Sequence, residues 1–211
     1  MIITQKQGTL EYLVAEGISV PHGFTTRFGG VSRGYLSGLN LGIHRGDKPE
    51  NVVKNYEILA SALDFDPKKL VLTRQTHSDI VRVVTEKDCL GLDHHLCPEC
   101  DGLITGTPDV ALVIFTADCT PILLHDPVTG AVGAVHAGWR GTVSSIAGKA
   151  VQAMTREFGT NPADLRAAIG PNIGVCCFET DADVPDAMLA AFGEEVRTFI
   201  YPKESKYYVN L

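Results

Sequence analysis

The side chains best suited to chemistry lie in residues 115–142, where Cys119 and His136 flank a predicted β-hairpin. Cys119 follows an apolar run that predicts a buried strand, and His136 ends the second strand of the hairpin, so both should lie at one end of a sheet. A thiolate and an imidazole placed together can be two zinc ligands, or a nucleophile and its base. A buried cysteine beside a hydrogen-bonded histidine, with no catalytic role, is the third interpretation that the spacing leaves open.

His77 lies in a polar turn, residues 73–78 (TRQTHS), between two predicted strands. Catalytic zinc sites typically have three protein ligands and leave a fourth position for water or substrate. Cys119 and His136 would be two of these ligands, so a zinc site here needs a third ligand from elsewhere in the chain. A histidine in such a turn fits a solvated loop residue as well as a ligand.

Residues 137–141 (AGWRG) lead from the hairpin into a predicted helix. The two glycines allow close approach of the backbone, and the start of the helix has free N–H groups that can bind an anion. Arg140 adds a guanidinium group suited to phosphate or carboxylate. The sequence therefore predicts an anion site beside the cysteine and the histidine.

The elements that must position these residues are a mixture of helices and strands. The expected helices span residues 50–63, 143–158 and 184–192, each with apolar residues at helical spacing. The expected strands span residues 70–73, 80–84, 111–116, 121–125, 131–136 and 166–169. Interleaved helices and short hairpin turns predict an α+β fold in layers, in one domain over residues 1–211.

Composition excludes several classes of protein. The chain has 211 residues, 45% of them apolar, and a net charge of −7, with an isoelectric point of about 5.4. A general nucleic-acid binder would be basic, and no apolar run reaches the roughly 18 residues of a membrane span. The first residues do not form a signal peptide, so we expect a cytoplasmic protein whose six cysteines are reduced.

The chain resembles the YfiH-like proteins, a family long described as multicopper polyphenol oxidase or laccase-domain proteins. The ordered motifs that carry the resemblance are residues 25–32 (TTRFGGVS), 39–42 (LNLG), 75–78 (QTHS), 116–119 (TADC), 136–141 (HAGWRG) and 169–173 (IGPNI). The resemblance implies mixed β-sheets enclosed by helices in α-β-β-α layers, as in the cytotoxic necrotizing factor deamidases. It also implies that the family's C-terminal helix and strand are lacking here.

The same resemblance implies a zinc site formed by His77, Cys119 and His136. It implies phosphorolysis of adenosine, inosine, guanosine and methylthioadenosine, with adenosine deamination as a further activity. The partners are then a nucleoside and phosphate, while the oligomeric state stays open. Arg27 and Arg140 are the best phosphate candidates, and Arg45 is a weaker one.

Several neighbours of these residues could orient substrate or a metal ligand, although a structural role is as compatible with their types. The polar ones are Asn40, Gln75 and Asp118. Phe28 and Trp139 could stack on a base or pack in the core. Glu179, after Cys176 and Cys177, could face the pocket.

The histidine count argues against a multicopper centre. The chain has seven histidines and no His-x-His pair. A multicopper centre of the usual oxidase kind has about ten histidines, arranged in repeated His-x-His pairs. Copper can still occupy a Cys/His₂ site adventitiously, since such sites bind it tightly. A metal-free Cys119–His136 amidase, acting on cell-wall precursors, is the second hypothesis, and a binding protein without turnover is the third.

Cys97 and Cys100 form a CxxC motif, with Cys89, His94 and His95 just upstream. A second, structural zinc is one interpretation of this cluster, but the usual partner CxxC is missing. A variable surface loop is the alternative.

Overall fold

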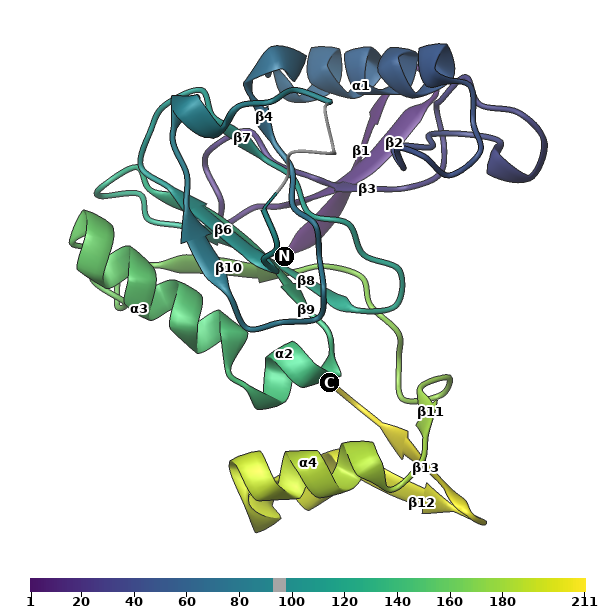
Figure 1. The fold of residues 1–211 in the computed structure, drawn as a ribbon, viewed down its shortest axis with the longest axis vertical. Helices are drawn as coiled ribbons and strands as arrows, with labels where there is room; N and C mark the ends of the chain where they lie inside the picture. The colour runs from purple at the N-terminus through teal and green to yellow at the C-terminus, as the bar shows by residue number, and fades with distance from the viewer. Residues whose placement is uncertain (93–97) are drawn as a thin grey trace.

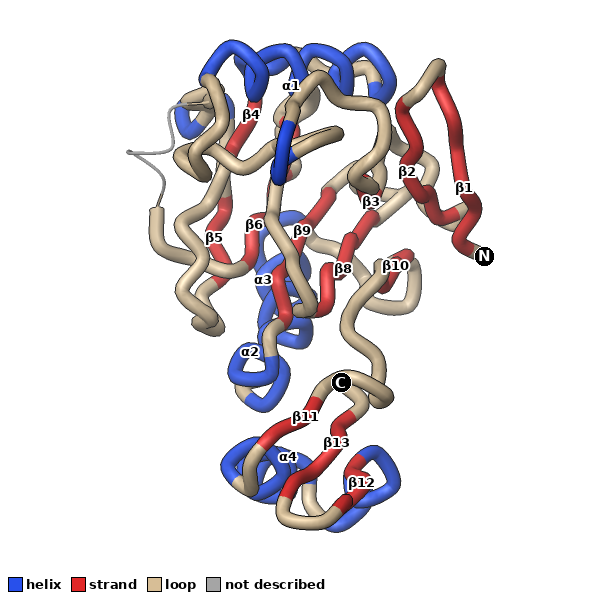
Figure 2. The backbone as a smooth tube through the Cα atoms, turned by 90° about the vertical axis from the view of Figure 1, so that its right-hand side faces the viewer, coloured by secondary structure: helices blue, strands red, loops and turns tan. Residues whose placement is uncertain are grey.

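The structure is a computed structural model, and it describes residues 1–92 and 98–211. Helices and sheets stack in four layers (Figure 1): α1, a layer that holds two small sheets, a five-stranded sheet, and α3. This arrangement confirms the predicted α+β fold of mixed sheets enclosed by helices. Figure 2 shows, after a 90° turn, that α4 and the last three strands lie together at the end of the molecule away from α1.

The five-stranded sheet carries the predicted hairpin. Its strands are, in spatial order, β10 (Arg166–Ile169), β8 (Thr120–His125), β9 (Val132–Ala137), β6 (Gly102–Thr105) and β5 (Val81–Val83). β5 and β6 pair in parallel, and all other neighbours pair antiparallel. The β8–β9 turn is fixed by the carboxylate of Asp126, which accepts hydrogen bonds from the backbone of Val128 and Thr129.

Two helices follow β9 where the sequence predicts one helix over residues 143–158. α2 (Trp139–Val143) starts earlier than expected, and α3 (Ile146–Phe158) begins after a break. The break lies at Ser145, whose φ of 58° is left-handed and cannot continue a helix. Gly159 ends α3 with a φ of 72°, as predicted. α3 packs on the five-stranded sheet through a core that includes Ile104, Val135, Ile146 and Met154.

The layer beneath α1 (Pro49–Leu63) consists of two separate sheets. One contains β1 (Ile2–Gln7), β2 (Leu10–Ala15) and β3 (Phe24–Thr25), and the other pairs β4 (Leu70–Val71) in parallel with β7 (Ala111–Leu112). The predicted strand 111–116 is therefore wrong beyond Leu112, because residues 113–116 lie outside the ladder. The sequence analysis did not predict β1, β2, β3, β6, or the last three strands.

The C-terminal part forms its own small core. It contains β11 (Glu179–Thr180), α4 (Asp183–Phe192), β12 (Ile200–Lys203) and β13 (Lys206–Val209), with strand order β11-β13-β12. Val184, Met188, Val196 and Val209 are buried there, and Trp139 of α2 packs against them. The described residues also contain short 3₁₀ helices, namely η1 (Gly34–Leu36), η2 (Pro67–Lys69), η3 (Glu86–Asp88) and η5 (Glu194–Phe199). None of the helices in residues 1–92 and 98–211 has both the length and the apolarity needed to cross a membrane.

Candidate metal site

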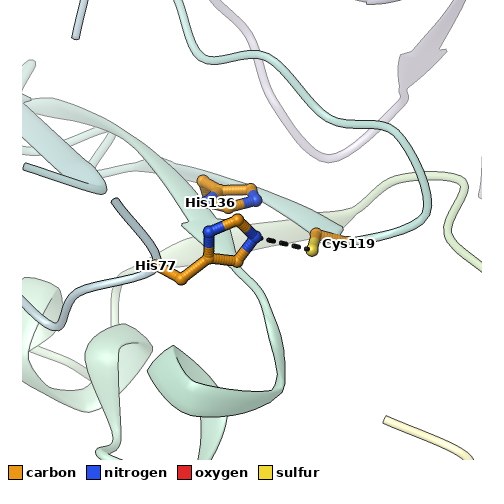
Figure 3. A group of neighbouring side chains, drawn as sticks. All are labelled: His77, Cys119 and His136. Carbon is orange, nitrogen blue, oxygen red and sulfur yellow. Dashed lines mark hydrogen bonds between the residues drawn. The ribbon is translucent and has the colours of Figure 1, made fainter. Parts of the chain in front are cut away.

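His77, Cys119 and His136 lie together, although they come from three separate segments (Figure 3). One ligand atom from each residue lies within 4.8 Å of the other two. Cys119 Sγ and His77 Nε2 are 3.8 Å apart, and the two imidazole rings meet edge to face with centroids 5.0 Å apart. The structure thus places Cys119 and His136 at one end of the sheet, as the hairpin predicts, and adds His77 to them.

The pairing of β8 with β9 explains how Cys119 reaches His136. Thr120 lies opposite Ala137 and Pro121 opposite His136, so Cys119 projects beside the residue that follows β9. That residue is Gly138, where an added Cβ would lie 2.8 Å from His77 Cδ2 and 3.1 Å from Cys119 Sγ. The glycine leaves the space in which the three side chains converge.

Asp101, directly before β6, holds two of the three residues in place, His136 through its side chain and His77 through its backbone. Its buried carboxylate accepts a hydrogen bond of 2.8 Å from His136 Nδ1. It also accepts the backbone N–H groups of Thr76, His77 and Ser78, at 3.2, 3.1 and 2.7 Å, and the Ser78 hydroxyl at 2.6 Å. These bonds stabilise the left-handed backbone of His77, whose φ is 59°.

The hydrogen bond to Asp101 also selects the tautomer of His136. A carboxylate can only accept, so His136 Nδ1 carries the proton and Nε2 keeps a lone pair. Burial raises the pKa of Asp101, but the hydrogen bonds from Ser78 and His136 outweigh it and leave the pKa below its ordinary value. The sequence analysis missed Asp101; its one signal is a lone acidic residue directly before the apolar strand of residues 102–105.

The thiol of Cys119 is disfavoured as a free nucleophile. Burial raises its pKa, and the negative charges of Asp118 and Asp101 raise it further. A neutral thiol is a weak nucleophile, whereas a bound metal ion would stabilise the thiolate. The nitrogen in hydrogen-bond contact with Cys119 belongs to His77, so a metal-free nucleophile–base pair would be Cys119–His77 and not the predicted Cys119–His136.

The predicted polar neighbours Gln75 and Asn40 have their side chains committed to the protein. Gln75 donates to the carbonyl of Phe115 at 2.6 Å and accepts from its N–H at 2.7 Å. Asn40 donates to Asp47 and accepts from the N–H of Gly42. Both contacts fix loops, which favours the structural interpretation of these two residues.

The two predicted phosphate ligands lie on the surface. Arg27 is exposed and donates one hydrogen bond to the carbonyl of Ser37. Arg140 is exposed and stacks on Trp139, with its guanidinium carbon 4.2 Å from the ring centroid. Trp139 itself packs against the C-terminal core, so core packing is the better interpretation of that ring.

Of the remaining candidates, Asp118 lies next to Cys119, and the structure does not bring the others to the metal site. Phe28 is exposed, and Asp118 has a left-handed backbone whose carbonyl accepts from the N–H of Ile173. Glu179 accepts a hydrogen bond of 2.6 Å from the Tyr208 hydroxyl in an exposed position. Cys97, His94 and His95 of the CxxC cluster lie outside the described residues, and Cys100 is buried.

The profile of a family described as "Multi-copper polyphenol oxidoreductase laccase" matches residues 21–211. The chain belongs to this family. It is 40% identical over 171 residues to "Purine nucleoside phosphorylase YlmD" of Bacillus subtilis, a match that covers 80% of this chain and 62% of that protein. It is 43% identical over 185 residues to "Purine nucleoside phosphorylase" of Deinococcus radiodurans, with coverages of 86% and 68%. The chain thus spans about two thirds of the length of these relatives.

Solved structures share the fold. A hypothetical protein YfiH from Bacillus licheniformis superposes with a TM-score of 0.90 at 34% identity, over 98% of this chain and 79% of that one. YlmD from Geobacillus stearothermophilus superposes with a TM-score of 0.83 at 32% identity, over 99% and 79% of the two chains.

The three side chains suit a single tetrahedral metal ion. Usual Zn–S and Zn–N bond lengths at a tetrahedral angle place sulfur and nitrogen about 3.5 Å apart, close to the 3.8 Å between Cys119 Sγ and His77 Nε2. Within residues 1–92 and 98–211 this is the one group of three such ligands. The described part of the chain therefore offers one mononuclear site and no cluster of the multicopper kind.

Proposed function

We propose that the chain is a zinc-dependent purine nucleoside phosphorylase. The observation that carries the proposal is the convergence of two imidazoles and one thiol, in a chain whose relatives have that name. Its substrates would be phosphate and adenosine, inosine, guanosine or methylthioadenosine, and adenosine deamination would be a side activity.

His77, Cys119 and His136 would hold the zinc ion and leave its fourth position to substrate or water. Bound zinc would supply a Lewis acid that polarises a phosphate or substrate oxygen. Asp101 keeps His136 in the tautomer with a free Nε2 lone pair and holds the His77 turn. Gly138 keeps the backbone clear of the ligands.

Phosphorolysis needs a bound phosphate whose oxygen attacks C1′ of the ribose while the bond from C1′ to the purine nitrogen breaks. The purine leaves with the electron pair of that bond, and the proton that hydrogen phosphate loses on becoming the sugar phosphate ends on the purine nitrogen. Arg140 and Arg27 expose guanidinium groups that can bind the dianion. Arg140 is better placed because it lies two residues from Gly138, at the start of α2.

The test is release of hypoxanthine from inosine by the zinc-loaded protein, with and without phosphate. We expect release only with phosphate, and its loss together with the zinc in Cys119→Ala. Cys176→Ala, which removes an exposed thiol, is the matched control and should keep both. Folded, zinc-loaded protein that leaves inosine intact would refute the proposal.

The 3.8 Å contact between Cys119 and His77 supports a second candidate, a metal-free cysteine amidase. That enzyme would stay active after a chelator has removed metal ions. Alkylation of Cys119 would inactivate it without releasing any metal ion. A copper-dependent oxidase would instead require copper for oxidation of a polyphenol, and zinc would not support it.

A further inference from the structure

Two exposed cysteines, Cys176 and Cys177, lie on the segment that connects β10 to β11. Their sulfur atoms are 3.0 Å apart, so the S–H of one thiol donates to the other sulfur. Side chains of consecutive residues point in opposite directions in an extended chain. Here a turn brings them together, because the N–H groups of Cys177 and Phe178 both donate to the carbonyl of Gly174. The chain therefore holds two thiols side by side at its surface.

The turn with the two thiols is tied to the segment that carries Cys119. Ile173 donates its N–H to the carbonyl of Asp118 at 2.8 Å. The Asn172 side chain donates to the Thr120 hydroxyl at 3.1 Å. These two bonds reach the residues on either side of Cys119, and the cysteine pair begins three residues after Ile173. The pair thus belongs to a loop that is held against one end of the metal site.

The charge of Asp118 acts on thiols of both groups. Burial raises the pKa of Cys119, the hydrogen bond with Cys176 raises the pKa of Cys177, and the negative charge of Asp118 raises both further. A neutral thiol reacts slowly with an oxidant, whereas a metal ion displaces the proton and binds the thiolate. The pair therefore suits the capture of a metal ion better than a redox reaction.

Two thiolates on one turn can chelate a thiophilic ion such as Zn²⁺. Usual Zn–S bonds at a tetrahedral angle place two sulfur atoms about 3.8 Å apart, so the pair at 3.0 Å must open by about 0.8 Å. Among residues 1–92 and 98–211, no third histidine, cysteine or carboxylate completes a group of three with this pair. Two protein ligands hold zinc more weakly than three, so a captured ion is released readily to a site with three.

We propose that Cys176 and Cys177 capture Zn²⁺ from solution and transfer it to the site of His77, Cys119 and His136. The inference rests on the zinc site proposed above and not on the reaction at that site. Both thiols of the pair are exposed, while Cys119 is half-buried and His136 is buried, so an ion that arrives from solvent meets the pair first. Each thiol of the pair loses its proton to water when the ion binds and regains one when the ion leaves.

The test follows by stopped flow the transfer of zinc from a chromophoric chelator to the apo protein. We expect Cys176→Ser and Cys177→Ser each to slow the transfer by on the order of 10-fold, since capture beside the final site makes the last step intramolecular and a chelate needs both sulfur atoms. The equilibrium affinity for zinc should stay unchanged, because neither thiol is a ligand of the resident ion. Cys89→Ser, which removes a half-buried thiol elsewhere, is the matched control and should load at the unchanged rate.

Cobalt(II), a coloured substitute for zinc, tests the capture step without the final site. Cys119→Ala removes the thiolate of that site, so the remaining absorption from thiolate to cobalt must come from other cysteines. We expect this absorption to be present, to disappear on dialysis because the pair binds weakly, and to be abolished when Cys177→Ser is added to Cys119→Ala.

Transfer to Cys177→Ser that is as fast as transfer to the unchanged chain would overturn the proposal, and so would an equal slowing by Cys89→Ser. A lower equilibrium affinity in Cys177→Ser would overturn it too, because the thiol would then hold the resident ion. Cys119→Ala without any absorption from thiolate to cobalt would exclude capture. A chain that takes up no zinc would refute this inference and the zinc site together, whereas a zinc-loaded chain that leaves inosine intact would refute the phosphorylase alone.

Discussion

Replacement of Asp101 by asparagine changes one oxygen of a buried carboxylate to an NH₂ group, which can donate but not accept. Each Asp101 oxygen already has donors around it. Oδ1 accepts from His136 Nδ1 and the N–H of His77, and Oδ2 accepts from the N–H groups of Thr76 and Ser78 and from the Ser78 hydroxyl. Asparagine can satisfy only one of these two sides.

Either orientation of the new side chain has a measurable cost. With its NH₂ group toward Ser78, two backbone N–H groups lose their acceptor, at about 1–3 kcal/mol each. With its NH₂ group toward His136, the imidazole must accept at Nδ1, and its proton moves to Nε2, where it competes with the metal ion. The first orientation loosens the turn that carries His77, and the second takes the Nε2 lone pair from the metal, so each disturbs one zinc ligand. We expect Asp101→Asn to lower the free energy of unfolding by up to about 6 kcal/mol, the sum for two unpaired N–H groups, and to weaken zinc binding by about 10–100-fold.

Asp126→Asn is the matched control for this experiment. Asp126 is also buried and also caps a turn, through Val128 and Thr129, but it lies at the opposite end of β8 from Cys119. It should lose stability and keep its zinc affinity. The assays are urea unfolding of the apo proteins and zinc competition against a chromophoric chelator. Folded Asp101→Asn protein that binds zinc within about twofold of the unchanged chain would refute the reasoning.

Further measurements probe separate contacts. Gly138→Ala places a methyl group among the metal-site side chains and should weaken zinc binding by about 5–100-fold, as overpacking of 1–3 kcal/mol implies. Gly17→Ala adds a methyl group in open space and should leave zinc affinity unchanged, so equal zinc affinities of the two variants would contradict the prediction. Gln75→Ala removes both hydrogen bonds to Phe115 and should lower the free energy of unfolding by about 1–3 kcal/mol; an unchanged urea midpoint would argue against it. Hydrogen bonds, first from Thr129, lower the pKa of Asp126 from 3.8 to about 2, so its contribution is present above pH 3.8 and is lost as the pH falls through 2. Asp126→Asn should flatten the fall of the urea midpoint over that range, and an equally steep fall would contradict the assignment.

Local patterns predicted the elements whose neighbours in space are also neighbours in sequence. The helix of residues 49–63 and the β8–β9 hairpin follow from apolar spacing and from the turn at Asp126. The hairpin alone places Cys119 near His136. The proximity of His77 depends on Asp101, which ties the His77 turn to β6 and β9 through contacts across more than twenty residues. No periodicity in the sequence reports such contacts.

Two elements differed from prediction for identifiable reasons. Apolar composition predicts a strand over residues 111–116, but strand pairing needs a partner, and β4 provides one only as far as Val113. Beyond it the Gln75 side chain takes over the hydrogen bonds of Phe115. The helix break at Ser145 depends on a left-handed residue that is not a glycine, and composition gives no sign of it.

Elemental analysis paired with a phosphorolysis assay tests the central claim most directly, namely that His77, Cys119 and His136 hold one zinc ion that phosphorolysis requires. We predict about one zinc per chain, phosphate-dependent release of hypoxanthine from inosine, and loss of both in Cys119→Ala. A folded Cys119→Ala protein that retains its zinc, or a zinc-free protein that still releases hypoxanthine with phosphate, would contradict the account.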